Sequence, residues 1–404
     1  WEARKLGGYD AACGYQLVAH LKLNTQHQKC WETALNYQTQ NTKHQTPNTK
    51  HHTPNTKKMK YTKVKIASFG YELPPNVVSS EDLEKRLAPL YDSLHFRKGQ
   101  LESLTGIRER RFWDPGFRMA EGAILAGEKS IAAADIDPQS IQMLVYGGVC
   151  RDNLEPATAC AVSNGLGLGP NTLVYDVSNA CLGILNGLVQ VANAIELGQI
   201  SAGLVVSCES AREIVDSTIQ RMLTAGTMDV FKQTVATLTG GSGAVAVLLT
   251  DASLSDRDHR LLGGAYQCAT QHHALCTWGP DSGISAVGKQ VMNTDSVGVL
   301  KHGVELGIET YRIFRKTLSL AADQPDKTVC HQVGSTHQDT ILKSIGIPRQ
   351  RDFATFQYLG NIGTVSLPIT AAIAAERDFF QTDDLVGMLG IGSGLNCLML
   401  GIAW

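Results

Sequence analysis

The stretch NTLVYDVSNACLGILNGLVQVANAIEL, from Asn171 to Leu197, decides the fold. Its residues Leu173 to Val177 form a short apolar run rich in β-forming side chains, which predicts a buried strand. After the turn Ser178-Asn179-Ala180, apolar residues recur at helical spacing from Leu182 onward. This pattern predicts a helix that follows the strand directly, with Cys181 at the junction.

Cys181 is a candidate nucleophile because of where it lies. A cysteine at the start of a helix faces free backbone amides and the positive end of the helix dipole, and both stabilise a thiolate. The alternative is that Cys181 is a small buried apolar residue, as most free cysteines are. This stretch alone does not decide between the two.

Composition restricts the classes of function. The 404 residues are 43% hydrophobic and 18% charged, which predicts a sizeable core, and the net charge of −2 gives no reason to expect a nucleic-acid surface. None of the ten cysteines has a zinc-binding spacing, so no metal site is predicted. No secretory signal is visible, so we expect free thiols in the cytoplasm. No apolar run reaches the ~18 residues of a membrane span.

Residues 1–58 differ from the rest of the chain. They carry the repeat NTKHQTP from Asn41, NTKHHTP from Asn48 and NTKK from Asn55. A polar, low-complexity tract of this kind predicts disorder. Because the repeat ends just before Met59, we expect a translated upstream segment that is not part of the native protein, and we exclude it from the fold.

From Met59 onward, predicted strands alternate with predicted helices, which is typical of an α/β protein. Residues 59–250 form a first half that carries Cys181, and residues 251–404 repeat the alternation in a second half. This suggests an internal duplication, although no sequence repeat is visible. In the second half we expect a strand from Tyr266 to Thr270, a polar loop from Gln271 to Ser296, and a helix N-capped by Ser335.

Four other places carry groups suited to catalysis. His331, in VCHQVGSTH, lies at a predicted strand end; Asn361, in LGNIGTVS, precedes a helix; and Glu155, in RDNLEPATA, lies in a loop. Each has an ordinary structural interpretation when taken singly. The open backbone of Gly390-Ile391-Gly392-Ser393-Gly394 could also direct an amide at an oxyanion.

Taken together, these residues suit carbon–carbon bond formation between thioesters. Cysteine accepts an acyl group, and neutral histidine and asparagine polarise the carbonyl of a second thioester as enolate charge develops. The same three residue types also serve papain-like proteases, in which the asparagine orients the histidine.

From Met59 to Trp404 the chain resembles the thiolase superfamily, specifically the 3-oxoacyl-ACP synthase III group. The resemblance rests on YTKVKIASFGYELPPNVVSSEDLEKRL, TGIRERRFW, SNACLG, HQV and GNIG, in that order, with 150 residues from Cys181 to His331 and 30 more to Asn361. CRDNLEPATA and GIGSGLNC resemble the branch that joins two long-chain acyl-CoAs head to head without decarboxylation.

The resemblance implies a five-layered αβαβα fold of two duplicated halves and an obligate homodimer. It implies acylation at Cys181, an oxyanion hole from the amides of Cys181 and Ser393, and a second acyl-CoA held by His331 and Asn361. Glu155 of the neighbouring subunit would then remove the α-proton, which a non-decarboxylative condensation requires. Neither a cofactor nor a metal is implied. The product would be a β-keto acid for olefin or ketone lipid synthesis, and acyl carrier protein or later enzymes of that route are candidate partners.

Several points stay open at this stage. Leu104 stands where typical members carry an arginine used for the CoA nucleotide, so no nucleotide contacts are assigned. The segment Ala211 to Leu238 lines an acyl channel or packs as ordinary core. The alternatives are a decarboxylating 3-oxoacyl-ACP synthase III, a condensing enzyme like HMG-CoA synthase, and a non-catalytic scaffold with a thiolase fold.

Overall fold

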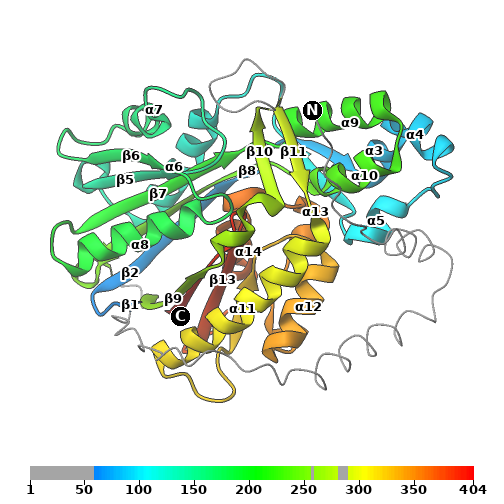
Figure 1. The fold of residues 1–404 in the computed structure, drawn as a ribbon. Helices are drawn as coiled ribbons and strands as arrows, with labels where there is room; N and C mark the ends of the chain where they lie inside the picture. The colour runs from blue at the N-terminus through cyan, green and yellow to red at the C-terminus, as the bar shows by residue number, and fades with distance from the viewer. Residues whose placement is uncertain (1–58, 256–258, 281–289) are drawn as a thin grey trace, which may run out of the picture. The chain divides into compact units, whose positions relative to one another are not determined.

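The computed structural model describes residues 59–255, 259–280 and 290–404, and the expectations for residues 1–58 lie outside these ranges. Within the described residues, ten strands form one mixed sheet (Figure 1). Its order is β12-β13-β14-β9-β2-β8-β7-β5-β6, and β1 (Met59–Lys60) pairs with β9. The two halves of the sheet meet where β2 and β9 pair at Lys65 and Arg260.

The first half of the sheet has the strand order 1-5-4-2-3 when its strands are numbered along the chain. β2 is antiparallel to β8 and β8 to β7, whereas β7, β5 and β6 are parallel. Three helices follow strands 1, 2 and 3. The bounds are β2 (Val64–Glu72), α6 (Met119–Ala134), β5 (Met143–Gly147), α7 (Thr158–Gly165), β6 (Leu173–Val177), α8 (Gly183–Glu196), β7 (Ala202–Glu209) and β8 (Gly243–Asp251).

The second half repeats this topology with the order 1-5-4-2 and the same strand directions. A single bridge between Thr328 and Asp352 stands where the third strand would be. The repeat confirms the α/β fold of two duplicated halves, while the division at residue 250 stays a prediction. The bounds are β9 (Arg260–Cys268), α11 (Ser296–Leu318), β12 (Lys327–Cys330), α12 (Ser335–Ile345), α14 (Ser366–Glu376), β13 (Leu385–Gly392) and β14 (Asn396–Ala403).

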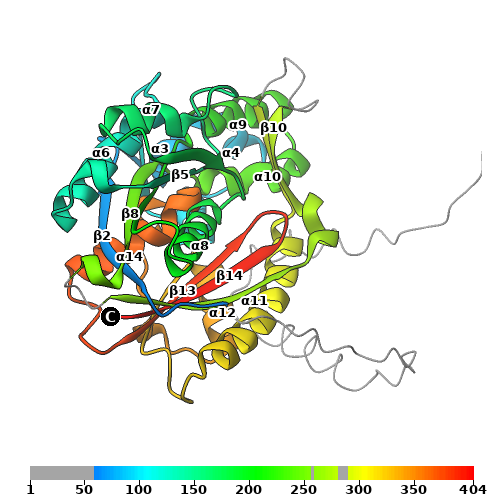
Figure 2. The ribbon, with the colours of Figure 1, turned by 90° about the vertical axis from the view of Figure 1, so that its left-hand side faces the viewer.

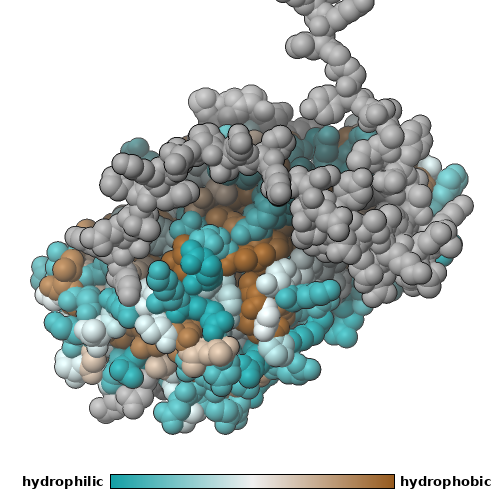
Figure 3. Space-filling model, turned by 60° about the horizontal axis from the view of Figure 1, so that its bottom comes forward, coloured by the Kyte–Doolittle hydropathy of each residue, from teal (hydrophilic) through white to brown (hydrophobic). Residues whose placement is uncertain are grey.

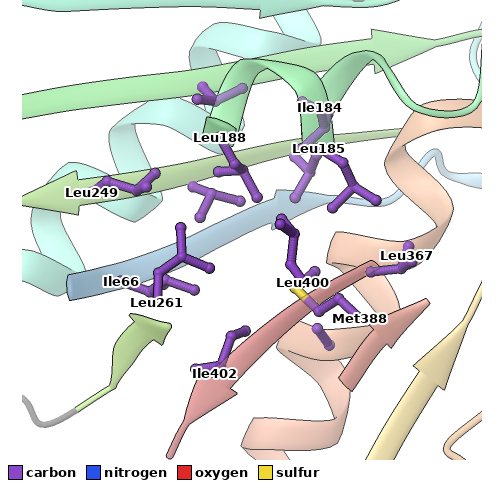
Figure 4. Close-up of a cluster of buried hydrophobic side chains, with 14 of the residues drawn as sticks. Ile66, Ile184, Leu185, Leu188, Leu249, Leu261, Leu367, Met388, Leu400 and Ile402 are labelled. Atoms are coloured by element: carbon purple, nitrogen blue, oxygen red, sulfur yellow. The ribbon is translucent and has the colours of Figure 1, made fainter. Parts of the chain in front are cut away.

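Three apolar clusters stack these elements into five layers (Figure 2). α6 and α7 cover the outer face of the first half of the sheet, and α11 and α12 cover the outer face of the second half. α8 and α14 lie between the two halves, where their apolar faces meet β2, β8, β13 and β14 (Figure 4). Because both of their faces are covered, β7 and β8 are almost continuous apolar runs.

Outside these layers, short elements form a fourth apolar cluster. Ile214, Val215, Ile219 and Met222 are buried in it and Leu223 is partly buried, as ordinary core packing requires. The remaining elements are β3 (Asn76–Ser79), α3 (Ser80–Arg86), α4 (Ala88–Ser93), α5 (Gln100–Thr105), β4 (Glu109–Phe112), η1 (Pro138–Ser140), α9 (Arg212–Ala225), α10 (Met228–Thr234), η2 (Val235–Thr239), η3 (Ala252–Leu254), η4 (Thr270–Leu275), β10 (Cys276–Pro280), β11 (Gln290–Thr294), η5 (Arg349–Arg351), α13 (Phe356–Leu359) and η6 (Gly363–Val365).

The strand from Leu173 to Val177 is not buried as predicted. β6 has the predicted bounds, but it pairs only with β5 and ends the sheet, and Leu173 is 56% exposed. An apolar run predicts that a strand is buried, but it does not show which neighbouring element covers the strand. In the isolated chain one edge of this strand is left uncovered.

Three details of the second half were also predicted wrongly. β9 begins six residues before the expected Tyr266, and the expected polar loop contains the hairpin of β10 and β11. Ser335 is the first residue of α12, whereas its N-cap is Gly334, which makes no side-chain cap bond. Each is a local pattern overridden by packing against distant elements.

Most of the described surface on the side shown in Figure 3 is polar, with apolar residues gathered near its centre. In the part of the chain that the structure describes, no helix is long and apolar enough to cross a membrane. The described ranges likewise contain no cluster of three or more His, Cys, Asp or Glu side chains suited to hold a metal ion.

Candidate active site

Cys181 lies in a tight turn between β6 and α8. Ala180, the preceding residue, has φ of +45°, a left-handed conformation that costs an alanine about 1–3 kcal/mol. Asn179 holds the turn, because its carbonyl accepts from the Leu182 amide at 2.9 Å and its side chain donates to Asn186 at 2.8 Å. A strained residue beside the candidate nucleophile is typical of functional sites.

The start of α8 lies directly against the end of β5. A Cβ built on Gly183 would lie 2.7 Å from the carbonyl oxygen of Gly147, closer than real Cβ atoms approach. Only glycine permits this contact, which fixes the height of Cys181 above the sheet. This gives the glycine of SNACLG a physical role.

The turn that carries Asn361 touches the same helix start. The Ile184 amide of α8 donates to the Thr364 hydroxyl at 2.8 Å, which satisfies one of the free amides at the helix N-terminus. The Oδ1 atom of Asn361 accepts from the Gly363 amide at 3.2 Å. Because Oδ1 is occupied there, the Asn361 NH2 group is left to donate elsewhere.

His331 follows β12 directly, as predicted, and its amide donates to the Leu389 carbonyl of β13 at 3.0 Å. The buried Asp352 holds the strand behind it by accepting from the Cys330 amide at 3.1 Å and from the Thr328 hydroxyl at 2.9 Å. Gln332 accepts from the amides at the start of α13 and donates to the Cys330 carbonyl. These bonds fix the backbone on both sides of the histidine.

Gly392 and Ser393 bring the end of β13 to Cys181. A Cβ built on Gly392 would lie 3.4 Å from the Cys181 nitrogen, so the two backbones are in contact. The amides of Cys181 and Ser393 both act on the Cys181 thiol and favour its charged form. These are the two amides that the sequence assigned to an oxyanion hole.

Desolvation shifts the pKa values of the two central side chains, Cys181 and His331, which are both half-buried. It raises the pKa of the Cys181 thiol to about 12, against the smaller lowering by the two amides. The two amides act in the direction expected of a helix start, whereas desolvation acts in the opposite direction and is the larger effect. Burial, with a further contribution from His337, lowers the pKa of His331 to about 4, so its imidazole is neutral at neutral pH.

Glu155 lies apart from this group in the isolated chain. It is exposed, on the loop between β5 and α7, and makes no hydrogen bond or ion pair within the described residues. The loop itself is firmly attached. Asp152 accepts from the first amides of α6, Met119 and Ala120, and Asp176 accepts from the first amides of α7, Thr158 and Ala159.

One buried carboxylate near the site was missed by sequence reasoning. Glu209 ends β7, is 4% exposed, and contributes to the raised pKa of Cys181 after burial and Cys276. Its signal in the sequence is weak, a single acidic residue closing the apolar run AGLVVSCE. Two surface hollows, of about 260 and 610 Å³, lie on the outer helical layers and are lined by none of the candidate residues.

Comparison with known proteins agrees with the fold. The model of 3-oxoacyl-(acyl-carrier-protein) synthase III matches residues 175–269, and the model of its C-terminal part matches residues 316–404. The class is thus that of the thiolase-like condensing enzymes, in which the fold and the cysteine at α8 already place the chain.

Full-length relatives narrow the class. The chain is 53% identical over 349 residues to the acyl-CoA:acyl-CoA alkyltransferase of Shewanella oneidensis, covering 86% of this chain and 100% of that protein. It is 33% identical to the enzyme of the same name from Xanthomonas campestris, with the same coverage. A solved structure of Xanthomonas campestris OleA superposes with a TM-score of 0.81 at 33% identity, covering 86% of this chain and 98% of that one. The chain belongs to this family of acyl-CoA:acyl-CoA alkyltransferases.

Proposed function

We propose that this protein joins two long-chain acyl-CoA thioesters by a non-decarboxylative Claisen condensation through an acyl-cysteine intermediate. The observation that carries the proposal is the meeting of Cys181, the Asn361 turn and the end of β13 at one helix start. Membership of the alkyltransferase family supports it, and a solved structure of Xanthomonas campestris OleA contains bound lauroyl-CoA.

The first half-reaction transfers an acyl group to Cys181. The thiol sulfur attacks the thioester carbonyl, the amides of Cys181 and Ser393 stabilise the oxyanion, and CoA leaves as the free thiol. The proton lost by Cys181 is the one that CoA gains overall. Because desolvation raises the pKa of Cys181, we expect proton removal to accompany the attack.

The second half-reaction forms the carbon–carbon bond. The carbonyl oxygen of a second acyl-CoA accepts from neutral His331 and from the Asn361 amide, and Glu155 removes the α-proton. The carbanion attacks acyl-Cys181, and the Cys181 sulfur leaves and takes up a proton again. The product is a 2-alkyl-3-oxoacyl-CoA, whose hydrolysis gives a β-keto acid for olefin or ketone lipid synthesis.

Glu155 acts across a homodimer in this proposal. β6 presents an uncovered apolar edge in the isolated chain, and edges of this kind pair readily with another strand. Beside that edge, Leu154 is 81% exposed and Glu155 is exposed on its anchored loop. Pairing of two β6 edges would cover both and bring each loop toward the other subunit.

Other parts of the proposal follow from the chemistry. The condensation uses the energy of the thioesters, so no cofactor is required. The eight described cysteines are free thiols, which suits the cytoplasm. Acyl carrier protein in place of CoA, and later enzymes of the lipid route as partners, remain proposals. We also propose that an acyl chain enters beside α9.

The decisive experiment uses myristoyl-CoA as the sole substrate for the full chain. Free CoA thiol is followed with a chromogenic reagent, and products are identified by mass spectrometry, with Cys181→Ala as the control without a nucleophile. We expect condensed product in the absence of any malonyl thioester. Coupling that appears only after malonyl-CoA or malonyl-ACP is added would establish the decarboxylating alternative instead.

Glu155→Gln separates the two half-reactions. It should leave acylation of Cys181 intact and slow condensation by about 10²–10⁴-fold, the range for loss of a general base. Glu128→Gln, an exposed glutamate on α6, is the matched control and should behave as the wild type. Unimpaired coupling in Glu155→Gln would remove this residue from the mechanism.

Mixed dimers test the role of the partner subunit. A dimer of one Cys181→Ala and one Glu155→Gln subunit has one complete site if Glu155 acts across the interface. Random mixing should therefore restore about a quarter of the wild-type rate. If Glu155 acts within its own subunit, mixing restores nothing.

A further inference from the structure

Glu209 is a buried carboxylate that forms no ion pair, although Arg151 acts on it as a neighbouring positive charge. It is 4% exposed, and no described lysine, arginine or histidine forms an ion pair with it. Burial raises the pKa of its carboxyl, against the hydrogen bonds it accepts. A carboxylate without an ion pair is expensive to bury, so its presence near the candidate nucleophile calls for a function.

Its two oxygens hold the beginning of the loop that carries Glu155. Oε1 accepts from the Val149 amide at 2.9 Å and Oε2 from the Cys150 amide at 3.1 Å. Cys150 is fixed further because its carbonyl accepts from the Tyr146 hydroxyl at 2.7 Å. Glu155 follows five residues after Cys150, so the carboxylate of Glu209 determines where its loop leaves the sheet.

The same carboxylate lies close to the turn that carries Asn361. A Cβ built on Gly363 would lie 3.5 Å from Cδ of Glu209, and the Gly363 amide is the one that orients Asn361. The duplicated topology explains this contact. Glu209 ends β7, the fourth strand of the first half, and Gly392 ends β13, the fourth strand of the second half. Gly392 contacts Cys181 at the start of α8, which is the central helix of the first half. Glu209 lies in the equivalent way near the turn before α14, the central helix of the second half.

We propose that Glu209 is a positioning residue that holds the Glu155 loop and the Asn361 turn in register with Cys181. The inference rests on the proposed function, because it assigns Glu155 to the condensation step. A carboxylate is needed because two amides donate to it. Glutamine would turn its own NH2 group toward one of them and lose that hydrogen bond.

Glu209 also acts on Cys181 through its charge. The titratable and charged groups that interact electrostatically with Glu209 are Cys150 and Arg151 on the loop, Tyr146 on β5 and the neighbouring Cys208 on β7. Cys181 faces Glu209 and, from β10, Cys276. Removal of the Glu209 charge should therefore make the Cys181 thiol easier to ionise, an effect that a merely structural residue would not have.

The test compares Glu209→Gln with the wild type in three measurements. Acylation of Cys181 by myristoyl-CoA should change less than about 3-fold, whereas condensation should fall about 100-fold, as for a misplaced reacting group. The pH profile of Cys181 alkylation by iodoacetamide should move to lower pH. Hydrogen exchange at residues 148–157 should accelerate.

Two further variants keep the outcome decisive. Glu209→Asp retains the charge but is too short to reach both amides, so it should slow condensation without moving the alkylation profile, and it replaces Glu209→Gln if that variant does not fold. Glu196→Gln is the matched control, since Glu196 accepts from two successive amides, Thr62 and Lys63, at the far end of α8. It should leave all three measurements unchanged.

Each failure has a separate meaning. If the wild type makes no condensed product from myristoyl-CoA alone, the proposed function fails, while hydrogen exchange still reports whether Glu209 holds the loop. If the wild type condenses but Glu209→Gln slows both half-reactions equally, or neither, the positioning role is overturned. Unchanged hydrogen exchange in a folded Glu209→Gln protein would overturn it as well.

Discussion

Gly183→Ala tests whether the contact between α8 and β5 positions the nucleophile. Gly183 is the first residue of α8, two residues after Cys181, and its built Cβ would lie 2.7 Å from the Gly147 carbonyl oxygen and 2.8 Å from the carbonyl carbon. Both of these atoms belong to the backbone of the strand below. Neither can move as the tip of a side chain would.

The expected size of the effect follows from these distances. Ordinary contacts of a Cβ begin near 3.4 Å, so the helix start must rise by 3.4 − 2.7, or about 0.7 Å. Overpacking of this kind costs about 1–3 kcal/mol, whereas replacing glycine by alanine in a helix gains at most about 1 kcal/mol. We expect a net loss of about 1–2 kcal/mol in the free energy of unfolding. Acylation should slow about 10- to 100-fold, because Cys181 moves with the helix.

Urea unfolding and the rate of CoA release from myristoyl-CoA measure the two effects. Gly303→Ala is the control, since that helical glycine lies in α11 and its built Cβ meets only the tip of Ile391, at 3.2 Å. The control should acylate at the wild-type rate. A Gly183→Ala protein as stable and as fast as the wild type would show that the contact does not set the height of Cys181.

Two further predictions concern the junction of the two halves and His331. Thr364→Val removes the hydroxyl that accepts from the buried Ile184 amide, so it should lower the free energy of unfolding by about 1–3 kcal/mol. Thr364→Ser keeps the hydroxyl and should lose less. Equal losses in urea unfolding of the two variants would contradict a stabilising role of this hydrogen bond. Because burial lowers the pKa of His331 to about 4, the unfolded chain binds this proton first as the pH falls. The free energy of unfolding is therefore not reduced by protonation of His331 above about pH 6.5, and it falls as the pH drops from 6.5 to 4. Between pH 7 and 5 the wild type should lose about 2 kcal/mol more than His331→Gln in urea unfolding, and parallel losses would refute this.

The alternation of strands and helices was readable from the sequence because the central elements are long and their patterns are strong. The bounds of β6 were predicted to the residue, whereas β9 begins six residues before the expected strand. The short hairpin of β10 and β11 was not predicted, because it packs against α9 and α10 and carries little periodicity of its own. The exposure of β6 was not readable either, since strand propensity does not state the strand's place in the sheet.

Much of the site was predicted from residue types at element ends. Cys181, His331 and Asn361 all lie where a strand ends or a helix begins, as expected. The local argument identified the favourable helix start at Cys181 but not the desolvation that opposes it, because a sequence does not show what surrounds the thiol. The role of Glu209 was not predicted for a similar reason. It ends an apolar strand, and only the fold reveals that its carboxylate faces two amides from a loop some sixty residues earlier.

The two halves share a topology but no visible sequence repeat, and the site explains why. At the start of the central helix the first half carries Cys181 and the second carries the Asn361 turn, so equivalent places need different chemistry. The third strand has diverged most. In the first half it is β6, an apolar edge available for another subunit, whereas in the second it has shrunk to the bridge at Asp352. There the carboxylate of Asp352 accepts from the Cys330 amide and thus holds the backbone before His331. The two halves thus share a framework and differ in the groups that they carry at equivalent places.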